Sequence, residues 1–153
     1  MAIRLEHSVT AKCRPEHVWE KFQKLEEWSW WNACIGQSKW LQGEPWKKGS
    51  RFQLEFVRPR SLKVQPVVLE AEAPAKVAWV GKAKGVTGEH WFSFELQPDG
   101  STTVLKTWED FSGPGTLLLG EGVKKDIVKM YADWLDALKA EAEKIAREQH
   151  ARS

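Results

Sequence analysis

The sequence has few of the residues that would place it in a specialised class. Its two cysteines, Cys13 and Cys34, make neither a disulfide framework nor a metal-ligand cluster, so we interpret both as reduced thiols. Residues 1–14 contain no apolar segment of the signal-peptide type, and no apolar run approaches the ~20 residues of a membrane span. We therefore expect one domain over residues 1–153, located in the cytoplasm and without a membrane span.

Neither the net charge nor the histidine content indicates a particular class of partner or cofactor. The net charge is +2, so no global field points to nucleic acid or to an anionic membrane. The histidines at positions 7, 17, 90 and 150 show no pairing at metal-ligand spacing. Gly81, Gly85 and Gly88 are too widely spaced for a dinucleotide-binding loop. We expect no metal, no cofactor and no nucleic-acid partner.

Tryptophan is the residue that the sequence has in excess, with ten copies against a single tyrosine. Two interpretations are open at this point. The tryptophans can form a core of bulky side chains, or they can line a cavity, because pockets for apolar ligands are built from such side chains.

The last quarter of the chain predicts one long amphipathic helix. Its apolar residues recur at spacings of three and four, and the segment contains no proline. They are Val123, Ile127, Met130, Tyr131, Trp134, Leu135, Leu138, Ala142 and Ile145. A helix over residues 123–147 would be about 37 Å long and could not bury this face alone. It therefore needs a sheet to cover it.

The upstream chain supplies that sheet. Residues 3–11 alternate as a half-buried strand, Pro15 suits the start of a first helix, and residues 26–31 form a second short helix or turn. Six further strands are predicted at 35–41, 51–56, 62–73, 77–81, 89–96 and 102–111. Pro66 places its strand at an edge or a bulge. Residues 82–88 are predicted to be a mobile loop, and we expect an α+β fold in which a curved antiparallel sheet grips the long helix.

Short motifs along nearly the whole chain carry a resemblance. They are Pro15-Glu16-His17-Val18-Trp19, Trp31-Asn32, Gly49-Ser50-Arg51-Phe52, Val68-Leu69-Glu70-Ala71, Val77-Ala78-Trp79-Val80-Gly81, Gly88-Glu89-His90-Trp91-Phe92, Pro98-Asp99-Gly100, Trp108-Glu109-Asp110-Phe111-Ser112-Gly113 and Leu138-Lys139-Ala140-Glu141-Ala142-Glu143. In this order the chain resembles the SRPBCC superfamily, also called the START or Bet v 1-like helix-grip fold, and most of all its polyketide cyclase/dehydrase-type members. Ala33 departs from the pattern, because a proline often follows Trp-Asn in the family.

The resemblance implies an internal cavity for a hydrophobic or amphipathic small molecule, and three functions remain open. The first is binding or carriage of such a ligand without catalysis. The second is a polyketide cyclase or dehydratase-like enzyme that uses acid–base chemistry. The third is a protein-interaction module related to activators of a chaperone ATPase, which would tolerate a filled core. Fold alone does not choose among them.

Two ionisable residues are candidates for the site. His90 shares strand parity with Phe92 and Phe94, and Glu109 shares parity with Leu105 and Phe111, so we expect both to face the helix. Val104 and Trp108 argue for the opposite face of the last strand. An inward Glu109 would be partly desolvated, which would raise its pKa and suit a general acid or base; a hydrogen-bonded structural pair is the alternative.

The predicted cavity walls consist of six large apolar side chains and the two ionisable ones. They are Trp31, Trp79, His90, Phe92, Phe94, Glu109, Met130 and Trp134. We expect His90 and Glu109 to orient the ligand, or to act on it. Residues 82–88 and 113–122 contain several glycines, and we expect them to form the mobile rim of the cavity. The sequence predicts no oligomeric state.

Overall fold

A computed structural model describes residues 2–152 of the chain. Its elements are β1 (Ile3–Ala11), α1 (Pro15–Phe22), the 3-10 helix η1 (Leu25–Glu27), α2 (Trp28–Trp31), β2 (Lys39–Gln42), β3 (Arg51–Phe56), β4 (Leu62–Val64), β5 (Val67–Glu72), β6 (Lys76–Ala83), β7 (Val86–Leu96), β8 (Thr103–Ser112), the 3-10 helix η2 (Pro114–Leu118) and α3 (Glu121–Arg152). The predicted class, a strand, two short helices, an antiparallel sheet and a long helix, is confirmed.

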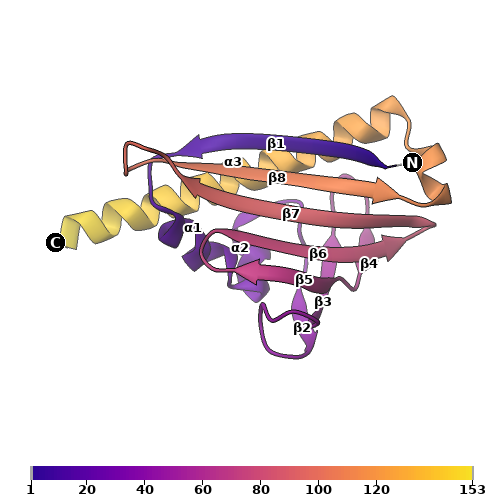
Figure 1. Cartoon of the computed structure of the whole chain (residues 1–153), viewed down its shortest axis with the longest axis horizontal. Helices are drawn as coiled ribbons and strands as arrows, with labels where there is room; N and C mark the ends of the chain where they lie inside the picture. The colour runs from indigo at the N-terminus through magenta and orange to yellow at the C-terminus, as the bar shows by residue number, and fades with distance from the viewer. Residues whose placement is uncertain (1, 153) are drawn as a thin grey trace.

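The strands form one antiparallel sheet in the order β1-β8-β7-β6-β5-β3-β2, with β4 paired to β3. β7 and β8 form its longest hairpin, in which His90 lies opposite Glu109. Figure 1 shows α3 crossing the concave side of this sheet diagonally, while α1 and α2 cover the same side near the C-terminal end of α3. The sheet and the helices therefore enclose one interior layer.

The helix α3 is longer than predicted, with 32 residues in place of 25, and its buried face follows the predicted periodicity. The buried residues are Met130, Tyr131, Trp134, Leu135, Leu138 and Ala142. They pack mainly against β1, β8 and α1. Residues spaced by three or four lie on one side of a helix, which is why the sequence identified this face.

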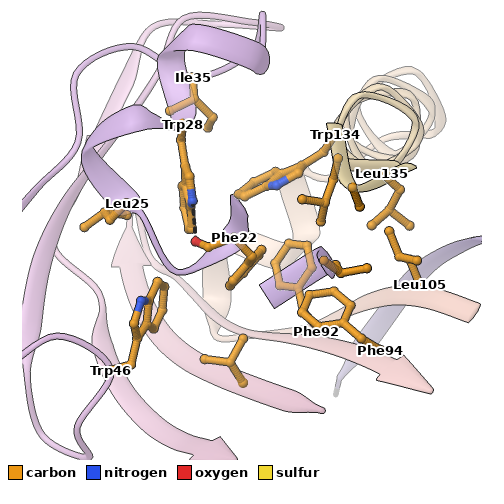
Figure 2. Packing of buried hydrophobic residues seen from close by; sticks show 14 of the residues in the cluster. Phe22, Leu25, Trp28, Ile35, Trp46, Phe92, Phe94, Leu105, Trp134 and Leu135 are labelled. Atoms are coloured by element: carbon orange, nitrogen blue, oxygen red, sulfur yellow. Dashed lines mark hydrogen bonds between the residues drawn. The ribbon is translucent and has the colours of Figure 1, made fainter. Parts of the chain in front are cut away.

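The core is dominated by aromatic side chains that surround Phe22 of α1. The ring centroids of Trp28 and Phe92 lie 5.1 and 4.9 Å from that of Phe22. Figure 2 shows Trp28, Trp46, Trp134, Phe92 and Phe94 converging on this ring from α2, the β2–β3 connection, α3 and β7. The indole N–H of Trp28 donates a 2.7 Å hydrogen bond to the Phe22 carbonyl, so its polar atom is satisfied inside the core.

Three predicted segments differ from the structure. Residues 82–88 are a tight hairpin and not a loop, because Lys84 and Gly85 both have positive φ, 50° and 77°, and join paired strands directly. Residues 62–73 are two strands, since the chain breaks at Pro66, which has no N–H to donate to a ladder. Of the predicted strand 35–41, only residues 39–41 belong to β2, whose pairing with β3 shifts register between Trp40 and Gln42. Ile35 makes an isolated bridge to Phe56.

Candidate functional site

A cavity of about 400 Å³ lies between the concave face of the sheet and the first half of α3. Most of its wall is aliphatic or aromatic. The apolar lining comes from Leu54, Phe56, Pro59, Leu62, Val64, Pro66, Trp79, Ala83, Val86, Phe111, Leu118, Leu119, Val123, Ile127 and Met130. The exposed side chains Leu118, Lys82 and Lys84 are among its lining residues, so we define its mouth as the end formed by β4, the β6–β7 hairpin, η2 and the start of α3. These elements lie at the right of Figure 1. The volume is within the range of small-molecule pockets.

Two glycines on neighbouring strands keep this space open. Gly81 of β6 and Gly88 of β7 pair with each other and both line the cavity. A Cβ atom on Gly81 would lie 3.7 Å from Pro66, in ordinary contact, so a side chain there would project into free space. A Cβ atom on Gly88 would lie 2.6 Å from Oε2 of Glu109, so Gly88 makes room for that carboxyl group.

The polar end of the cavity is built from three elements. β7 contributes His90, β8 contributes Glu109 directly opposite, and α3 contributes Tyr131. The Tyr131 hydroxyl donates a 2.6 Å hydrogen bond to Oε1 of Glu109. Nδ1 of His90 lies 3.7 Å from the same oxygen, beyond hydrogen-bond distance. The parity of β8 is therefore the one favoured above, with Glu109 directed inward and Lys106 outward towards Glu6.

Thr107 determines which ring nitrogen of His90 carries the proton. The Thr107 hydroxyl donates a 2.9 Å hydrogen bond to the carbonyl of Trp91, which can only accept. Its oxygen lies 2.7 Å from Nε2 of His90, so Nε2 carries the proton and donates to Thr107. Nδ1 is then an unprotonated acceptor on the side of the ring that faces Glu109.

Burial sets the charge of both groups. It raises the pKa of the Glu109 carboxyl from 4.5 to about 7, and the hydrogen bond from Tyr131 opposes part of the rise. It lowers the pKa of His90 from 6.5 to about 3. His90 is therefore neutral at physiological pH, and the 3.7 Å contact is not an ion pair. Glu109 exchanges a proton near neutrality in a site of low polarity.

The structure divides the eight predicted wall residues into two groups. Trp79, His90, Glu109 and Met130 line the cavity. Trp31, Phe92, Phe94 and Trp134 do not line it, because they pack into the aromatic core or against it. The predicted rim segments 82–88 and 113–122 both contribute to the mouth, through Lys82, Lys84 and Leu118 among others. That any of these residues binds a ligand stays a prediction.

Sequence reasoning missed three residues that shape the site. Tyr131 was placed on the buried face of the helix but not beside Glu109, because helix-to-sheet register is not encoded in a local pattern. The sequence places Gly81 at the end of the strand predicted at 77–81 and Gly88 in the predicted rim, and it gives neither residue a part in the cavity wall. Their shared parity with Trp79 and His90 was the available signal, since it places both positions on the inner face.

No group of three or more His, Cys, Asp or Glu side chains gathers at metal-binding distance anywhere in residues 2–152. Within the same range, no helix combines the length and the apolar character that crossing a bilayer requires.

Solved structures share this fold at low sequence identity. The aromatase/cyclase Zhui from Streptomyces sp. R1128 is 17% identical, with a TM-score of 0.77 and 94% of each chain covered. A hypothetical protein from Helicobacter pylori is 22% identical, with a TM-score of 0.75 over 93% of this chain and 88% of the other. Ara h 8.0201 is 13% identical, with a TM-score of 0.72 over 93% and 98%. These likenesses show the Bet v 1-like helix-grip fold.

The family comparison extends over most of the sequence. No curated protein matches the chain closely enough to count as a relative. The sequence profile of the family described as polyketide cyclase / dehydrase and lipid transport matches residues 2–143. This agrees with the resemblance drawn from the motifs, and with a scaffold that binds ligands. The chain therefore belongs to the polyketide cyclase/dehydrase and lipid transport family.

Proposed function

We propose that the protein binds a hydrophobic or amphipathic small molecule in the cavity between the sheet and α3. The observation that carries the proposal is the contrast between the walls and the inner end of this 400 Å³ space. Apolar side chains from five strands, η2 and α3 form most of its wall. Arg60, Lys82, Lys84 and Asp126 also line it, and His90 and Glu109 form the polar pair between β7 and β8. Pockets of this kind bury the apolar part of a ligand and orient it through few polar contacts.

His90 and Glu109 determine which polar group the ligand should carry. Nδ1 of His90 is a free acceptor, so it suits a hydroxyl donor such as a phenol. The Glu109 carboxyl, when protonated, can donate to a carbonyl oxygen. An anionic group is disfavoured at this end, because Glu109 itself becomes charged above about pH 7 and the surroundings are poorly solvated. We therefore expect an apolar molecule with a hydroxyl or carbonyl group.

Tryptophan fluorescence tests this proposal directly. Trp79 is the one tryptophan that lines the cavity among the described residues, so a ligand beside its indole should change the emission saturably. Flavonoids and polycyclic phenols carry the expected hydroxyl and carbonyl groups and are suitable probes, and micromolar affinity is expected. Fatty acids, whose carboxylate is disfavoured at the polar end, serve as the comparison. Trp79→Phe should remove most of the signal while native mass spectrometry still detects the complex.

A matched pair of variants separates the cavity from the rest of the surface. Gly81→Leu places a branched side chain in the cavity and should abolish binding. Val80→Leu adds a methylene one residue away, where alternation points the side chain to the other face of the sheet, and should bind as the wild type does. If no probe binds the wild type, or if Gly81→Leu binds as well as Val80→Leu, the cavity is not the binding site.

The pKa of Glu109 supports a cyclase or dehydratase activity as a second candidate. A carboxyl with a pKa of about 7 can accept or donate a proton at neutral pH, whereas His90, with a pKa of about 3, is too weak a base. In a dehydration, the Glu109 carboxylate would take the proton α to a ligand carbonyl. The same carboxyl would then protonate the β-hydroxyl group, which leaves as water while the carbon–carbon double bond forms.

Glu109→Gln separates the two candidates, because it keeps the shape of the side chain and removes its proton exchange. Binding without catalysis requires that the variant retain nearly full affinity for the probes. Catalysis requires in addition that the wild type convert a β-hydroxy carbonyl compound and that the variant fail to do so. The interaction-module alternative needs no cavity, and it becomes the preferred function only if no small molecule binds.

A further inference from the structure

Two leucines next to the cavity mouth are almost fully exposed. Leu117 and Leu118 of η2 have exposed fractions of 90% and 81%, the highest of the large hydrophobic side chains in the described chain. Leu118 also lines the mouth itself. A hydrogen bond of 2.9 Å from the Gly115 N–H to the Gly85 carbonyl fastens η2 to the tip of the β6–β7 hairpin. The leucines therefore project from an anchored turn.

Basic side chains share the rim of the cavity with Leu118, since Arg60, Lys82 and Lys84 line the same space. The segments that meet at the mouth, 57–63, 82–86 and 113–126, contain seven lysines or arginines and two acidic residues. They are Arg58, Arg60, Lys63, Lys82, Lys84, Lys124 and Lys125, against Glu121 and Asp126. These three segments thus have a net charge of +5 while the whole chain has +2, so the other residues together have −3. The modest total charge conceals a strong asymmetry.

Several of these cations have no ion-pair partner among residues 2–152. Lys63 lies 3.8 Å from Glu55, and Lys124 lies 3.4 Å from Glu121. No salt bridge is formed there by Arg58, Arg60, Lys82, Lys84 or Lys125. Exposed apolar side chains inside a cluster of uncompensated cations are the combination that binds the interface of an anionic bilayer.

We propose that this end of the protein docks on the surface of an anionic lipid bilayer. Leu117 and Leu118 insert at the boundary between headgroups and acyl chains, while Arg58, Arg60, Lys82 and Lys84 contact the lipid phosphates. The cavity mouth then faces the bilayer, and an apolar ligand passes between the membrane and the cavity with little exposure to water. This delivery role rests on the proposed function, whereas the docking itself does not.

Charge favours a membrane over a second copy of the chain. Two copies joined through this surface would bring two clusters of +5 into contact, which is repulsive at low ionic strength. A bilayer offers the complementary sign, together with an apolar layer for the two leucines. Binding should therefore require acidic lipid and should weaken as salt screens the attraction.

Co-sedimentation of the full chain with phosphatidylcholine vesicles, with and without phosphatidylglycerol, tests the proposal. The wild type should bind only the vesicles that contain phosphatidylglycerol. The pair Leu117→Ser and Leu118→Ser should lower the partition coefficient about tenfold or more, because the inserting area is lost. The pair Lys82→Glu and Lys84→Glu should lower it by a similar factor through charge reversal.

Two control variants carry matched changes outside the mouth. Trp30→Ser removes a side chain that is 75% exposed on α2, and Lys47→Glu with Lys48→Glu reverses two charges at the opposite end of β3. Both should bind vesicles within about twofold of the wild type, since neither position touches the docking surface. All variants alter exposed residues, and circular dichroism should show native folding.

Three outcomes would overturn the docking proposal. One is equal binding to vesicles with and without acidic lipid. Another is a loss of vesicle binding in the control variants that equals the loss in the mouth variants. The third is a dimer, seen by size-exclusion chromatography, that the leucine variants dissociate without any vesicle binding. Vesicle binding and binding of the cavity probes are measured in separate assays. If the protein binds vesicles but no probe, only the proposed function is refuted. If it binds a probe but no vesicles, only the docking proposal is refuted.

Discussion

Replacing Glu109 by glutamine should change how the stability of the protein depends on pH. The Glu109 carboxyl has a pKa of about 7 in the folded chain and near 4.5 once it is exposed to water. A group whose pKa is raised by folding contributes stability below its unfolded pKa and loses it as the pH rises through its folded pKa. Keeping this carboxyl buried therefore costs about 1 kcal/mol at pH 5 and about 3 kcal/mol at pH 8.

The glutamine of the variant Glu109→Gln does not ionise, so the variant avoids the cost of burying a carboxylate, which increases with pH. Relative to the wild type, its free energy of unfolding should increase by about 2–3 kcal/mol between pH 5 and pH 8. His90 contributes the opposite dependence, since its pKa is lowered to about 3 and its stabilisation is lost as the pH falls below 6.5. That contribution is present in both proteins and cancels in the difference.

Urea melts followed by circular dichroism at pH 5 and pH 8 measure this difference. Glu95→Gln is the matched control, because Glu95 lies on the neighbouring strand β7 with its side chain exposed to solvent. It should follow the wild type at both pH values. A difference between Glu109→Gln and the wild type that stays constant within about 0.5 kcal/mol would show that Glu109 is not desolvated in solution.

Further tests concern the helix, the polar cluster and the thiols. Leu138→Ala should cost about 2–5 kcal/mol of unfolding free energy in urea melts because Leu138 is fully buried, whereas the exposed Asp136→Ala should cost less than about 0.5 kcal/mol. Tyr131→Phe should raise the pKa of Glu109 further, since the hydrogen bond that lowers it is lost; a carboxyl NMR titration would show the shift. Burial raises the pKa of Cys13 to about 11, so its reaction with a thiol reagent at pH 8 should be slow until the chain is unfolded.

The fold was predictable because its main signals are periodic. The apolar stripe of α3 and the alternation of β1 and β7 each repeat over many residues, so single exceptions do not hide them. In β8 the hydrophobic pattern was a weaker guide to which side chains face inward, because the outer face of the sheet also carries aromatic side chains. Trp91 and Trp108 stack there with ring centroids 5.7 Å apart, and a lysine amine lies over each ring. This outer pair explains why Trp108 argued for the wrong parity.

Local turn geometry was the least predictable part of the site. Glycines at 81, 85 and 88 are compatible with a mobile loop, and also with a strand, a turn and a second strand in succession. Only the positive φ of Lys84 together with Gly85 selects the two-residue hairpin, and lysine gives no sequence signal for it. The hairpin matters for the site, because it extends β6 and β7 beyond the predicted strand ends and places Gly81 and Gly88 opposite each other in the cavity lining.

The distribution of the tryptophans decides between the two interpretations that the composition left open. Trp28, Trp46 and Trp134 are buried around Phe22, at the end of the molecule covered by α1 and α2 (Figure 2). Trp19, Trp31 and Trp40 pack against the same cluster, whereas Trp30 is exposed and Trp91 and Trp108 lie on the outer face. None of residues 15–31 lines the cavity, so most of the tryptophans fill the core at one end, and smaller apolar side chains and glycines leave space at the other. Trp79 lies at the boundary, 6.3 Å from Phe22 and in the cavity wall. The aromatic cluster therefore forms the back of the pocket, and a ligand bound there, as proposed, would be confined to the other end and would contact Trp79.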